Sequence, residues 1–472
     1  MGTQSDLFYA AVKSRDARFD GRFFTAVKTT GIYCRPICPA RTPLKKNVQF
    51  FACAAAAEEA GFRPCRRCRP ESAPGTPVWL GPSATVSRAL RLIERGVLDE
   101  LGVEALASQL GIGDRYLRRL FAKHLGTSPQ AVAASRRAHF ARVLLDASPQ
   151  PVTQIALASG FHSIRQFNDV IRAVFGQTPT QLRGARQPRS GDTRLRLAFR
   201  PPFAWDTLIA FLKARSIPGV ERVEGGTYRR TFAGAAGPEV LSVCQSADRR
   251  TLELTVSGAA PVGLFDVVRR TRRLFDLDAD PLAIATSFRG SGLRLAPGLR
   301  VPGSWDTFET LVRAVLGQQI SVKAATTIAG RFAETFGEAV ESPFPQLRLL
   351  TPTAHHVANS NAAALMKIGV TSARANTLLG LSRAMVGNPQ LLEPGADVDA
   401  AMARLKELPG IGEWTAQYLA MRAFSWPDAF PATDLGIRKA LGTGSEREIL
   451  AIAEGWRPWR GYAAMHLWRT LS

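Results

Sequence analysis

The arrangement of cysteines constrains the fold of this chain more than any other feature. The sequence of 472 residues contains six cysteines, and four of them form two close pairs. Cys34 and Cys38 make a C-x3-C pair, and Cys65 and Cys68 make a C-x2-C pair. Short chelate loops of this kind place two thiolates on neighbouring vertices of a tetrahedron, which is the geometry that zinc prefers. The spacing therefore predicts a Zn²⁺ site built from four cysteines.

Disulfide bonds are the alternative interpretation of the same pairs, but a reducing compartment keeps thiols reduced. Cys53 and Cys244 have no close partner in the sequence, and we expect them to be buried small hydrophobic residues. A module of about 70 residues has little apolar core of its own. Metal binding would therefore supply much of its folding free energy.

The overall charge favours a polyanionic partner. The chain has 61 Lys and Arg against 39 Asp and Glu, a formal net charge of +22, which indicates DNA as the partner. Its length and its hydrophobic content of 46% suffice for about three or four packed domains. We find no basic leader with an apolar core and no apolar run that could span a bilayer, so we expect a cytoplasmic, nucleoid-associated protein.

The cysteine region resembles a known family. The segments "DGRFFTAVKTTGIYCRPICPARTPLKKNVQFF" and "GFRPCRRC" resemble the amino-terminal domain of Ada, the bacterial adaptive-response regulator. The resemblance implies that the Cys34 thiolate accepts a methyl group irreversibly from a methylated DNA phosphate, while Cys38, Cys65 and Cys68 complete the metal site. It also implies DNA-backbone contacts at the positions Thr30, Arg41 and Arg63. Pro39 stands where the family pattern has a basic residue.

The implied reaction is chemically sensible. A zinc-bound thiolate stays deprotonated at neutral pH and can act as a nucleophile. Methylation would change the charge of a four-thiolate site from about −2 to about −1, which lowers its repulsion of DNA phosphates. We therefore expect DNA binding to tighten after methyl transfer.

Two helical units follow, "GVEALASQLGIGDRYLRRLFAKHLGTSP" and "PVTQIALASGFHSIRQFNDVIRAVFGQTP". Each has an apolar helix, a turn with glycine and a second amphipathic helix, the order that a helix-turn-helix requires. Two such units in tandem resemble the DNA-binding domain of AraC-type activators, which implies RNA polymerase as a further partner. Candidate base readers are the polar residues at the start of each second helix: Asp114, Arg115, Arg118, Ser163, Arg165, Gln166 and Asn168.

The second half of the chain predicts different chemistry. A second methyl-accepting cysteine in a Pro-Cys-His-Arg setting is not found in the sequence. Residues 227–258 contain clustered β-formers between glycines and prolines, which predict an antiparallel sheet. From "WDTFETLVRAVLGQQ" onward the pattern is helical, and "LPGIG" connects two apolar helices. Gly410 and Gly412 in this hairpin would allow backbone N–H groups to approach a DNA phosphate.

This hairpin, followed by "FPATDLGIRK", resembles the helix-hairpin-helix DNA glycosylases, with AlkA, the 3-methyladenine DNA glycosylase II type, as the nearest match. The resemblance places Asp434 at the catalytic position, although this residue alone would be taken as a helix N-cap. It places Trp414, Tyr418 and Trp468 in the pocket for a flipped base. Trp414 stands where strand-cleaving members have lysine, so we expect base excision without lyase activity. "GQQIS" leaves open whether Gln319 or Ile320 is the wedge residue.

We thus predict a multidomain α+β chain, in which an Ada-type and AraC-type regulator is fused to an AlkA-type glycosylase. The oligomeric state expected is a monomer. The alternative is a DNA-binding regulator with a structural zinc site and a carboxyl-terminal half that binds damaged DNA without catalysis. The expected divisions are a zinc-binding α/β domain at 1–78, an all-α helix-turn-helix domain at 79–184, a linker at 185–194, a sheet subdomain at 195–290 and an all-α glycosylase domain at 291–472.

Overall fold

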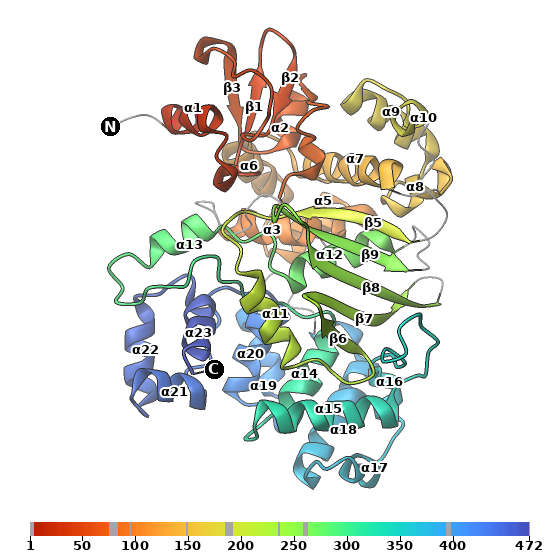
Figure 1. Cartoon of the computed structure of the whole chain (residues 1–472), viewed down its shortest axis with the longest axis vertical. Coiled ribbons are helices and arrows are strands. Elements are labelled where there is room, and N and C mark those ends of the chain that lie inside the picture. The colour runs from red at the N-terminus through yellow and green to blue at the C-terminus, as the bar shows by residue number, and fades with distance from the viewer. Residues whose placement is uncertain are drawn as a thin grey trace. The chain divides into compact units, whose positions relative to one another are not determined.

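The computed structural model describes residues 4–74, 84–94, 96–147, 150–184, 192–234, 237–257, 263–392 and 398–471 (Figure 1). Most of the predicted linker at 185–194 lies outside these residues. The chain divides into two compact units. The first comprises Met1–Pro201, Ser246–Arg269 and Leu277–Asp280, and the second comprises Pro202–Gln245, Arg270–Asp276 and Pro281–Ser472.

A four-stranded sheet begins the first unit, with the strand order β3-β1-β2-β4. Strand β1 is antiparallel to β2 and β3, whereas β2 is parallel to β4. Phe24, Ala26 and Tyr33 pack against Ala57 to form a small core. The elements are α1 (Gln4–Ser14), η1 (Ala17–Phe19), β1 (Phe24–Val27), β2 (Ile32–Cys34), η2 (Lys45–Asn47), β3 (Val48–Phe51), α2 (Ala54–Glu59), β4 (Arg63–Pro64) and η3 (Pro70–Ser72).

The predicted tandem helical units are present in the first unit. The first helical unit predicted is α5 (Val103–Gln109) with α6 (Asp114–Leu125), and the second is α8 (Val152–Ala158) with α9 (Ile164–Phe175). The other helices of this region are α3 (Ala84–Glu94), α4 (Val97–Glu100), α7 (Pro129–Ala147) and α10 (Pro179–Arg183). The second helices of the two units bury side chains at the same spacing. Leu117, Phe121 and Leu125 are buried on α6, and Phe167, Ile171 and Phe175 are buried on α9. This spacing of four residues buries one face of each helix and leaves the opposite face in contact with solvent.

A buried polar group joins α2 to α7. Tyr33 donates its hydroxyl proton to Glu58 across 2.7 Å, and the Nε2 atom of His139 lies 2.7 Å from the same carboxylate oxygen. The side chains of Glu58 and His139 are only 11% and 14% exposed. Burial alone would raise the pKa of Glu58 and lower that of His139, but their mutual attraction reverses both effects. The two groups therefore form a buried ion pair.

Strands β5 (Thr193–Ala198) and β9 (Thr251–Ser257) pair antiparallel in the first unit, with Arg194 opposite Thr255 and Arg196 opposite Glu253. Alternate residues of both strands are buried, so one face of this pair packs inward and the other is polar. Strand β5 begins at Thr193, within the stretch predicted as linker. Helix α12 (Leu264–Leu274) continues from the first unit into the second.

The second unit contains an antiparallel meander and a helical bundle. The meander is formed by β6 (Glu221–Glu224), β7 (Thr227–Gly234) and β8 (Gly237–Gln245), as the β-formers at 227–258 predict. The helices are α11 (Trp205–Lys213), α13 (Pro281–Ser287), α14 (Thr307–Leu316), α15 (Val322–Phe336), α16 (Ala354–Ala358), α17 (Ala362–Lys367), α18 (Ser372–Gly387), η4 (Pro389–Leu392), α19 (Val398–Lys406), α20 (Glu413–Arg422), α21 (Leu435–Leu441), α22 (Glu446–Glu454) and α23 (Arg460–Arg469). The predicted multidomain α+β class is confirmed.

Within the described residues, the structure contains no helix with the length and apolar character needed to cross a membrane.

Candidate functional sites

Strand pairing brings the two cysteine pairs together. In the parallel β2–β4 pair, Ile32 lies opposite Arg63 and Tyr33 opposite Pro64. The next residues along the two strands are Cys34 and Cys65. Continued in register, the pairing places these two cysteines side by side, although they are distant in the sequence.

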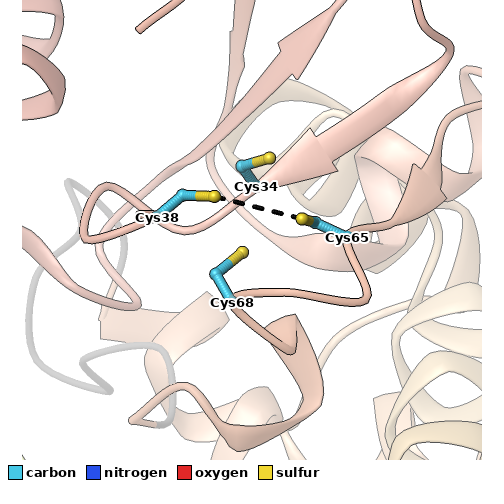
Figure 2. A group of neighbouring side chains, drawn as sticks. All are labelled: Cys34, Cys38, Cys65 and Cys68. Carbon is cyan, nitrogen blue, oxygen red and sulfur yellow. Dashed lines mark hydrogen bonds between the residues drawn. The ribbon is translucent and has the colours of Figure 1, made fainter. Parts of the chain in front are cut away.

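Two tight turns add the remaining sulfurs. Cys38 donates its backbone N–H to the carbonyl of Arg35 across 3.1 Å, and Arg69 donates its own to the carbonyl of Cys65 across 3.0 Å. Figure 2 shows the four side chains pointing toward one another. All four sulfurs lie within 4.8 Å of one another, a spacing that fits a single metal ion.

The protonation of the thiols supports this fit. Contact with Cys38 raises the pKa of Cys34, whereas contact with Cys34 lowers the pKa of Cys38 to about 7. Such opposite shifts arise because four neighbouring sulfurs cannot all ionise without a cation. A divalent ion with tetrahedral preference removes this conflict, because it favours all four thiolates at once.

The four sulfurs are not equivalent. Cys65 and Cys68 are buried, whereas Cys34 and Cys38 are partly exposed. Arg35 donates its backbone N–H to the sulfur of Cys68 across 3.3 Å, and its buried guanidinium is paired with Asp20. Backbone hydrogen bonds also lower the pKa of Cys38. Partial exposure thus separates Cys34 and Cys38 from the two buried sulfurs, and a backbone hydrogen bond separates Cys38 from Cys34.

The two cysteines outside this cluster differ in burial. Cys53 is buried as predicted, and burial raises the pKa of its thiol to about 11. Cys244 was expected to be buried but is only partly buried, because it alternates with the buried residues Leu241 and Val243 and lies on the other face of β8.

The residues near the cysteine pairs that were predicted to contact the DNA backbone are on the protein surface. Thr30, Arg41 and Arg63 are exposed, as is Pro39. Thr30 lies in the turn between β1 and β2, where Gly31 has a φ of +66°. Arg63 is on β4, two residues before Cys65. These positions make Arg63 and Thr30 neighbours of the cysteine-bearing strands.

The candidate base readers lie at the starts of α6 and α9. Arg115, Arg165 and Gln166 are exposed, while Arg118 and Asn168 are partly exposed. Arg118 donates to Gln130 across 3.1 Å and lies 3.7 Å from Asp114. Ser163 caps α9 by accepting a hydrogen bond from the backbone of Gln166, so its side chain is engaged in the helix start.

Asp434 is both a helix cap and a residue of a cavity. One carboxylate oxygen, Oδ1, accepts the backbone N–H of Ile437 at 3.0 Å, which caps α21. The same oxygen accepts the indole N–H of Trp468 at 2.8 Å, and Oδ2 accepts that of Trp414 at 2.8 Å. Three donors from three segments therefore fix the orientation of this carboxylate.

The cavity beside Asp434 lies within the second unit and has a volume of about 1090 Å³. All three predicted pocket aromatics, Trp414, Tyr418 and Trp468, line it. The rings of Trp414 and Tyr418 stack with centroids 5.2 Å apart, one turn apart on α20. Because these two rings stack on each other, a base can stack on an outer face of the pair but not between the two rings.

Sequence reasoning missed the opposite wall of the cavity. Phe211 and Arg215 line it, with the Arg215 guanidinium 3.7 Å from the centre of the Phe211 ring. Burial lowers the pKa of Arg215 to about 10. Arg313 also lines the cavity and is paired with Glu221 at 3.0 Å. Phe211 lies in an apolar helix, where an aromatic residue is normally part of the hydrophobic core. The sequence therefore contains no signal that Phe211 lines a cavity.

The predicted hairpin connects α19 to α20, and its two glycines have different surroundings. Gly410 has a φ of +84°, and a Cβ there would lie 2.0 Å from the side chain of Thr377. Gly412 begins α20, and a Cβ there would meet nothing within 4 Å. Gly410 is therefore required by the fold, whereas Gly412 leaves open space in front of the helix start. Gln318 donates to the Gly410 carbonyl across 3.2 Å, which ties the hairpin to the mouth of the cavity.

The two candidate wedge residues differ in conformation. Gln319 is exposed and has a φ of +56°. Residues other than glycine rarely adopt this left-handed backbone conformation. Ile320 is partly buried, and both residues line the cavity. A strained residue at the rim indicates a functional constraint, and it favours Gln319 as the projecting side chain.

Four family models match successive parts of the chain. They are the metal binding domain of Ada at residues 8–71, a helix-turn-helix domain at 106–185, the AlkA N-terminal domain at 194–306 and the HhH-GPD superfamily of base excision DNA repair proteins at 312–443. Together with the four-sulfur cluster, the first match confirms the predicted Zn²⁺.

One relative matches the whole arrangement. The protein named "Probable bifunctional transcriptional activator/DNA repair enzyme AlkA" of Mycobacterium tuberculosis is 42% identical over 480 residues, which cover 98% of this chain and 96% of that protein. This chain belongs to that family. As a member of the bifunctional AlkA family, it combines a zinc-binding module, a DNA-binding helix-turn-helix region and a DNA glycosylase. The predicted fusion is confirmed.

Other relatives of this bifunctional AlkA protein match its separate halves. DNA-3-methyladenine glycosylase 2 of Escherichia coli is 36% identical over 58% of this chain and 96% of its own length. Ada of Escherichia coli is 38% identical over 38% of this chain, which spans 49% of the length of Ada. The solved 3-methyladenine DNA glycosylase from Archaeoglobus fulgidus has a TM-score of 0.50 and 22% identity, covering 58% of this chain and 97% of that one, which shows a shared fold.

Proposed function

We propose that this protein repairs alkylated DNA by two separate reactions and activates transcription in response to one of them. In the first reaction, Cys34 accepts a methyl group from a DNA methyl phosphotriester. In the second, Asp434 assists hydrolysis of the N-glycosidic bond of alkylated bases such as 3-methyladenine. The observation that carries the proposal is the setting of Asp434, a carboxylate held by two indole N–H groups on the wall of an aromatic cavity.

The methyl transfer requires an accessible thiolate. Bound zinc would keep the sulfurs of Cys34, Cys38, Cys65 and Cys68 deprotonated at neutral pH. The Cys34 sulfur forms a bond to the methyl carbon, the bond from that carbon to the phosphate oxygen breaks, and the phosphodiester leaves as an anion. The product is a thioether, so each molecule reacts once. The partial exposure of Cys34 supports this assignment.

Base release requires only one carboxylate. Alkylation at N3 or N7 gives the purine a positive charge, so the base leaves without being protonated. As the bond between C1′ and the base breaks, Asp434 stabilises the positive charge that develops on the sugar or orients the water that adds to C1′. The electron-rich rings of Trp414, Tyr418 and Trp468 attract a cationic base, each by about 0.5–2 kcal/mol. Trp414 offers no amine, so we expect no Schiff base and no strand cleavage.

DNA engagement in the first unit uses two kinds of contact. We assign phosphate contacts to Thr30, Arg41 and Arg63, which are exposed near the cysteine-bearing strands. We assign base contacts to the exposed starts of α6 and α9, at Arg115, Arg118, Arg165, Gln166 and Asn168. Gly410 and Gly412 place the hairpin of the second unit against the backbone near the lesion. We expect the protein to act as a monomer that recruits RNA polymerase.

Paired substitutions test the two reactions separately. Asn is also a good N-cap, so Asp434→Asn should keep α21 folded but reduce release of 3-methyladenine at least about 100-fold, while methyl transfer continues. Cys34→Ala should abolish methyl transfer, observed by mass spectrometry as one added methyl group on a named cysteine, while base release continues. Cys53→Ala, outside the cluster, is the matched control and should leave both reactions intact.

The same assays decide the alternative function. A regulator with a structural zinc site and a non-catalytic second half would show neither an added methyl group nor released base in the wild type. The sulfurs of Cys34 and Cys38 are both partly exposed. A methyl group found on Cys38 would therefore keep the proposed sensor function but identify Cys38, not Cys34, as the nucleophile.

A further inference from the structure

A second cavity lies within the first unit. No cysteine of the cluster lines it, although Arg35, Ile37, Pro39 and Arg69, which adjoin those cysteines in the sequence, do. It has a volume of about 1500 Å³. Its walls come from the loops around Arg15 and Ile37, from α7 and α10, and from strands β5 and β9 with the turn before β9. We call it the sheet-face cavity, because the polar face of the β5–β9 pair forms one wall.

The sheet-face cavity is strongly cationic. Nine arginines and four carboxylates line it, so positive charges exceed negative ones by five. Two of the carboxylates are already neutralised, because Asp20 is paired with Arg35, and Asp146 is paired with both Arg69 and Arg142. Of the remaining six lining arginines, only Arg196 is paired, with Glu253; in the part of the chain that the structure describes, no carboxylate forms an ion pair with Arg15, Arg183, Arg194, Arg249 or Arg250.

The strand register directs two arginines into this cavity. Alternate residues of β5 are buried, including Leu195 and Leu197, whereas Arg194 and Arg196 are exposed on the other face. Arg196 lies 3.5 Å from Glu253 on the neighbouring strand, but their side chains are 73% and 45% exposed. Such a pair is weak in water, so Arg196 remains available to another anion.

A built turn places two more arginines at the end of the same face. Asp248 accepts hydrogen bonds from the Ser246 hydroxyl at 2.6 Å and from the Arg250 backbone at 3.0 Å. Arg249 has a φ of +56° in this turn, and both arginines are exposed. The Asp248 carboxylate is thus engaged in shaping the turn, which fixes the backbone from which both exposed arginines project.

We propose that the sheet-face cavity binds the phosphodiester backbone of a DNA strand. Guanidinium groups match phosphate oxygens with two parallel hydrogen bonds, and several of them along one wall suit a repeating anion. The lining arginines are spread over β5, α7, α10 and the turn before β9, which favours a stretch of strand over a single small anion. This surface would extend DNA contact onto the β5–β9 sheet face, and it needs neither Cys34 nor Asp434.

Salt-dependent DNA binding by the full chain tests this site. The probe is an unalkylated 30-base-pair duplex without an operator, and its affinity is measured by fluorescence anisotropy over a range of salt concentrations. The double substitution Arg249→Ala and Arg250→Ala should weaken binding and reduce the slope of log Kobs against log salt by about two, because each lost phosphate contact removes about 0.9. Replacement of both residues by Lys should restore most of the slope.

A matched control removes two arginines elsewhere. Arg222 and Arg348 are on the second unit, are paired with Glu224 and Glu334, and line neither cavity. Their double Ala variant should keep the wild-type slope. An unchanged slope in the Arg249 and Arg250 variant, or an equal loss in the control, overturns the proposal. The proposal is also overturned if the Arg249 and Arg250 variant binds the duplex normally but no longer binds inorganic tripolyphosphate, since this would identify a site for small anions.

Discussion

Trp414 donates its indole N–H to Asp434 across 2.8 Å, although the two residues are 20 positions apart in the sequence. Trp414 starts the helix after the hairpin, and Asp434 starts the helix that follows it. The spacing between the hairpin and the aspartate in the family's sequence pattern therefore has a structural role here. It brings the Trp414 ring, which lines the cavity, within hydrogen-bonding distance of the Asp434 carboxylate. Trp468 holds the other carboxylate oxygen from the last helix.

Substitution of Trp414 by Phe should slow base release while keeping an aromatic face. A hydrogen bond to a charged group contributes about 1.5–3 kcal/mol, so its loss should reduce the single-turnover rate about tenfold to 100-fold. Trp456→Phe is the matched control. Trp456 does not line the cavity, and its buried indole nitrogen has no hydrogen-bond partner among the residues that the structure describes. Equal rates for wild type and Trp414→Phe would show that this hydrogen bond does not orient the reacting carboxylate.

Removal of zinc should affect the two reactions differently. The cysteine cluster holds together a small sheet with a limited core. A chelator should therefore abolish methyl transfer and lower the melting temperature of the first unit. Release of 3-methyladenine should continue, because no cysteine of the cluster lines the cavity of Asp434. Both activities are measured on the same chelated sample, and re-addition of Zn²⁺ serves as the control. Parallel loss of both activities would contradict the prediction.

The ion pair of His139 and Glu58 should make stability depend on pH. The attraction of Glu58 raises the pKa of His139 above 6.5 despite burial, so the stabilisation is complete below about pH 6.5 and is lost as the pH rises through the raised value. The pKa of Glu58 is lowered below 4.5 despite burial, so its contribution is lost only at lower pH. The free energy of unfolding of the first unit should therefore be greatest between about pH 4.5 and 6.5.

Urea unfolding at a series of pH values measures this effect. His139→Gln should flatten the decrease above pH 6.5, because glutamine carries no proton that can be lost. His124, which is outside the pair, provides the matched variant His124→Gln, and its profile should follow the wild type. A decrease of the same size in His139→Gln would assign the pH dependence to other groups.

The strained residue at the cavity mouth should contribute to base flipping. Gln319→Ala removes the projecting side chain and should slow base release from a fully paired duplex by about tenfold, since unstacking costs a few kcal/mol. The effect should be much smaller when the lesion is opposite an abasic site. Ile320→Ala is the comparison, and a larger loss there than at Gln319 would identify Ile320 as the wedge.

The sequence was most informative where chemistry depends on spacing along the chain. The two cysteine pairs predicted Zn²⁺, and the tandem helical units and the hairpin predicted the domain families that the comparisons show. Asp434 was predicted both as an N-cap and as a catalytic residue, and the structure places it as a cap on the cavity wall. Local pattern was sufficient for these features because each is carried by a short, continuous segment.

Features that depend on tertiary packing could not be predicted. Phe211 reaches the cavity from α11, whose sequence indicates only a core element, and Arg215 reaches it from just beyond the end of that helix. The buried pair of His139 and Glu58 joins positions 81 apart, and no periodicity relates them. Strand β5 was partly assigned to a linker, because the arginines that alternate along it indicate a charged segment until β9 is seen beside it.

The double role of Asp434 has a consequence for how this enzyme can change over generations. Because one carboxylate both starts α21 and faces the cavity, most replacements there would fray a helix as well as stop the reaction. Laboratory selection for new lesions should therefore collect its mutations at Phe211 and Arg215, on the wall that begins no helix. Changes in lesion specificity are therefore expected at the Phe211 and Arg215 wall of the cavity rather than at Asp434.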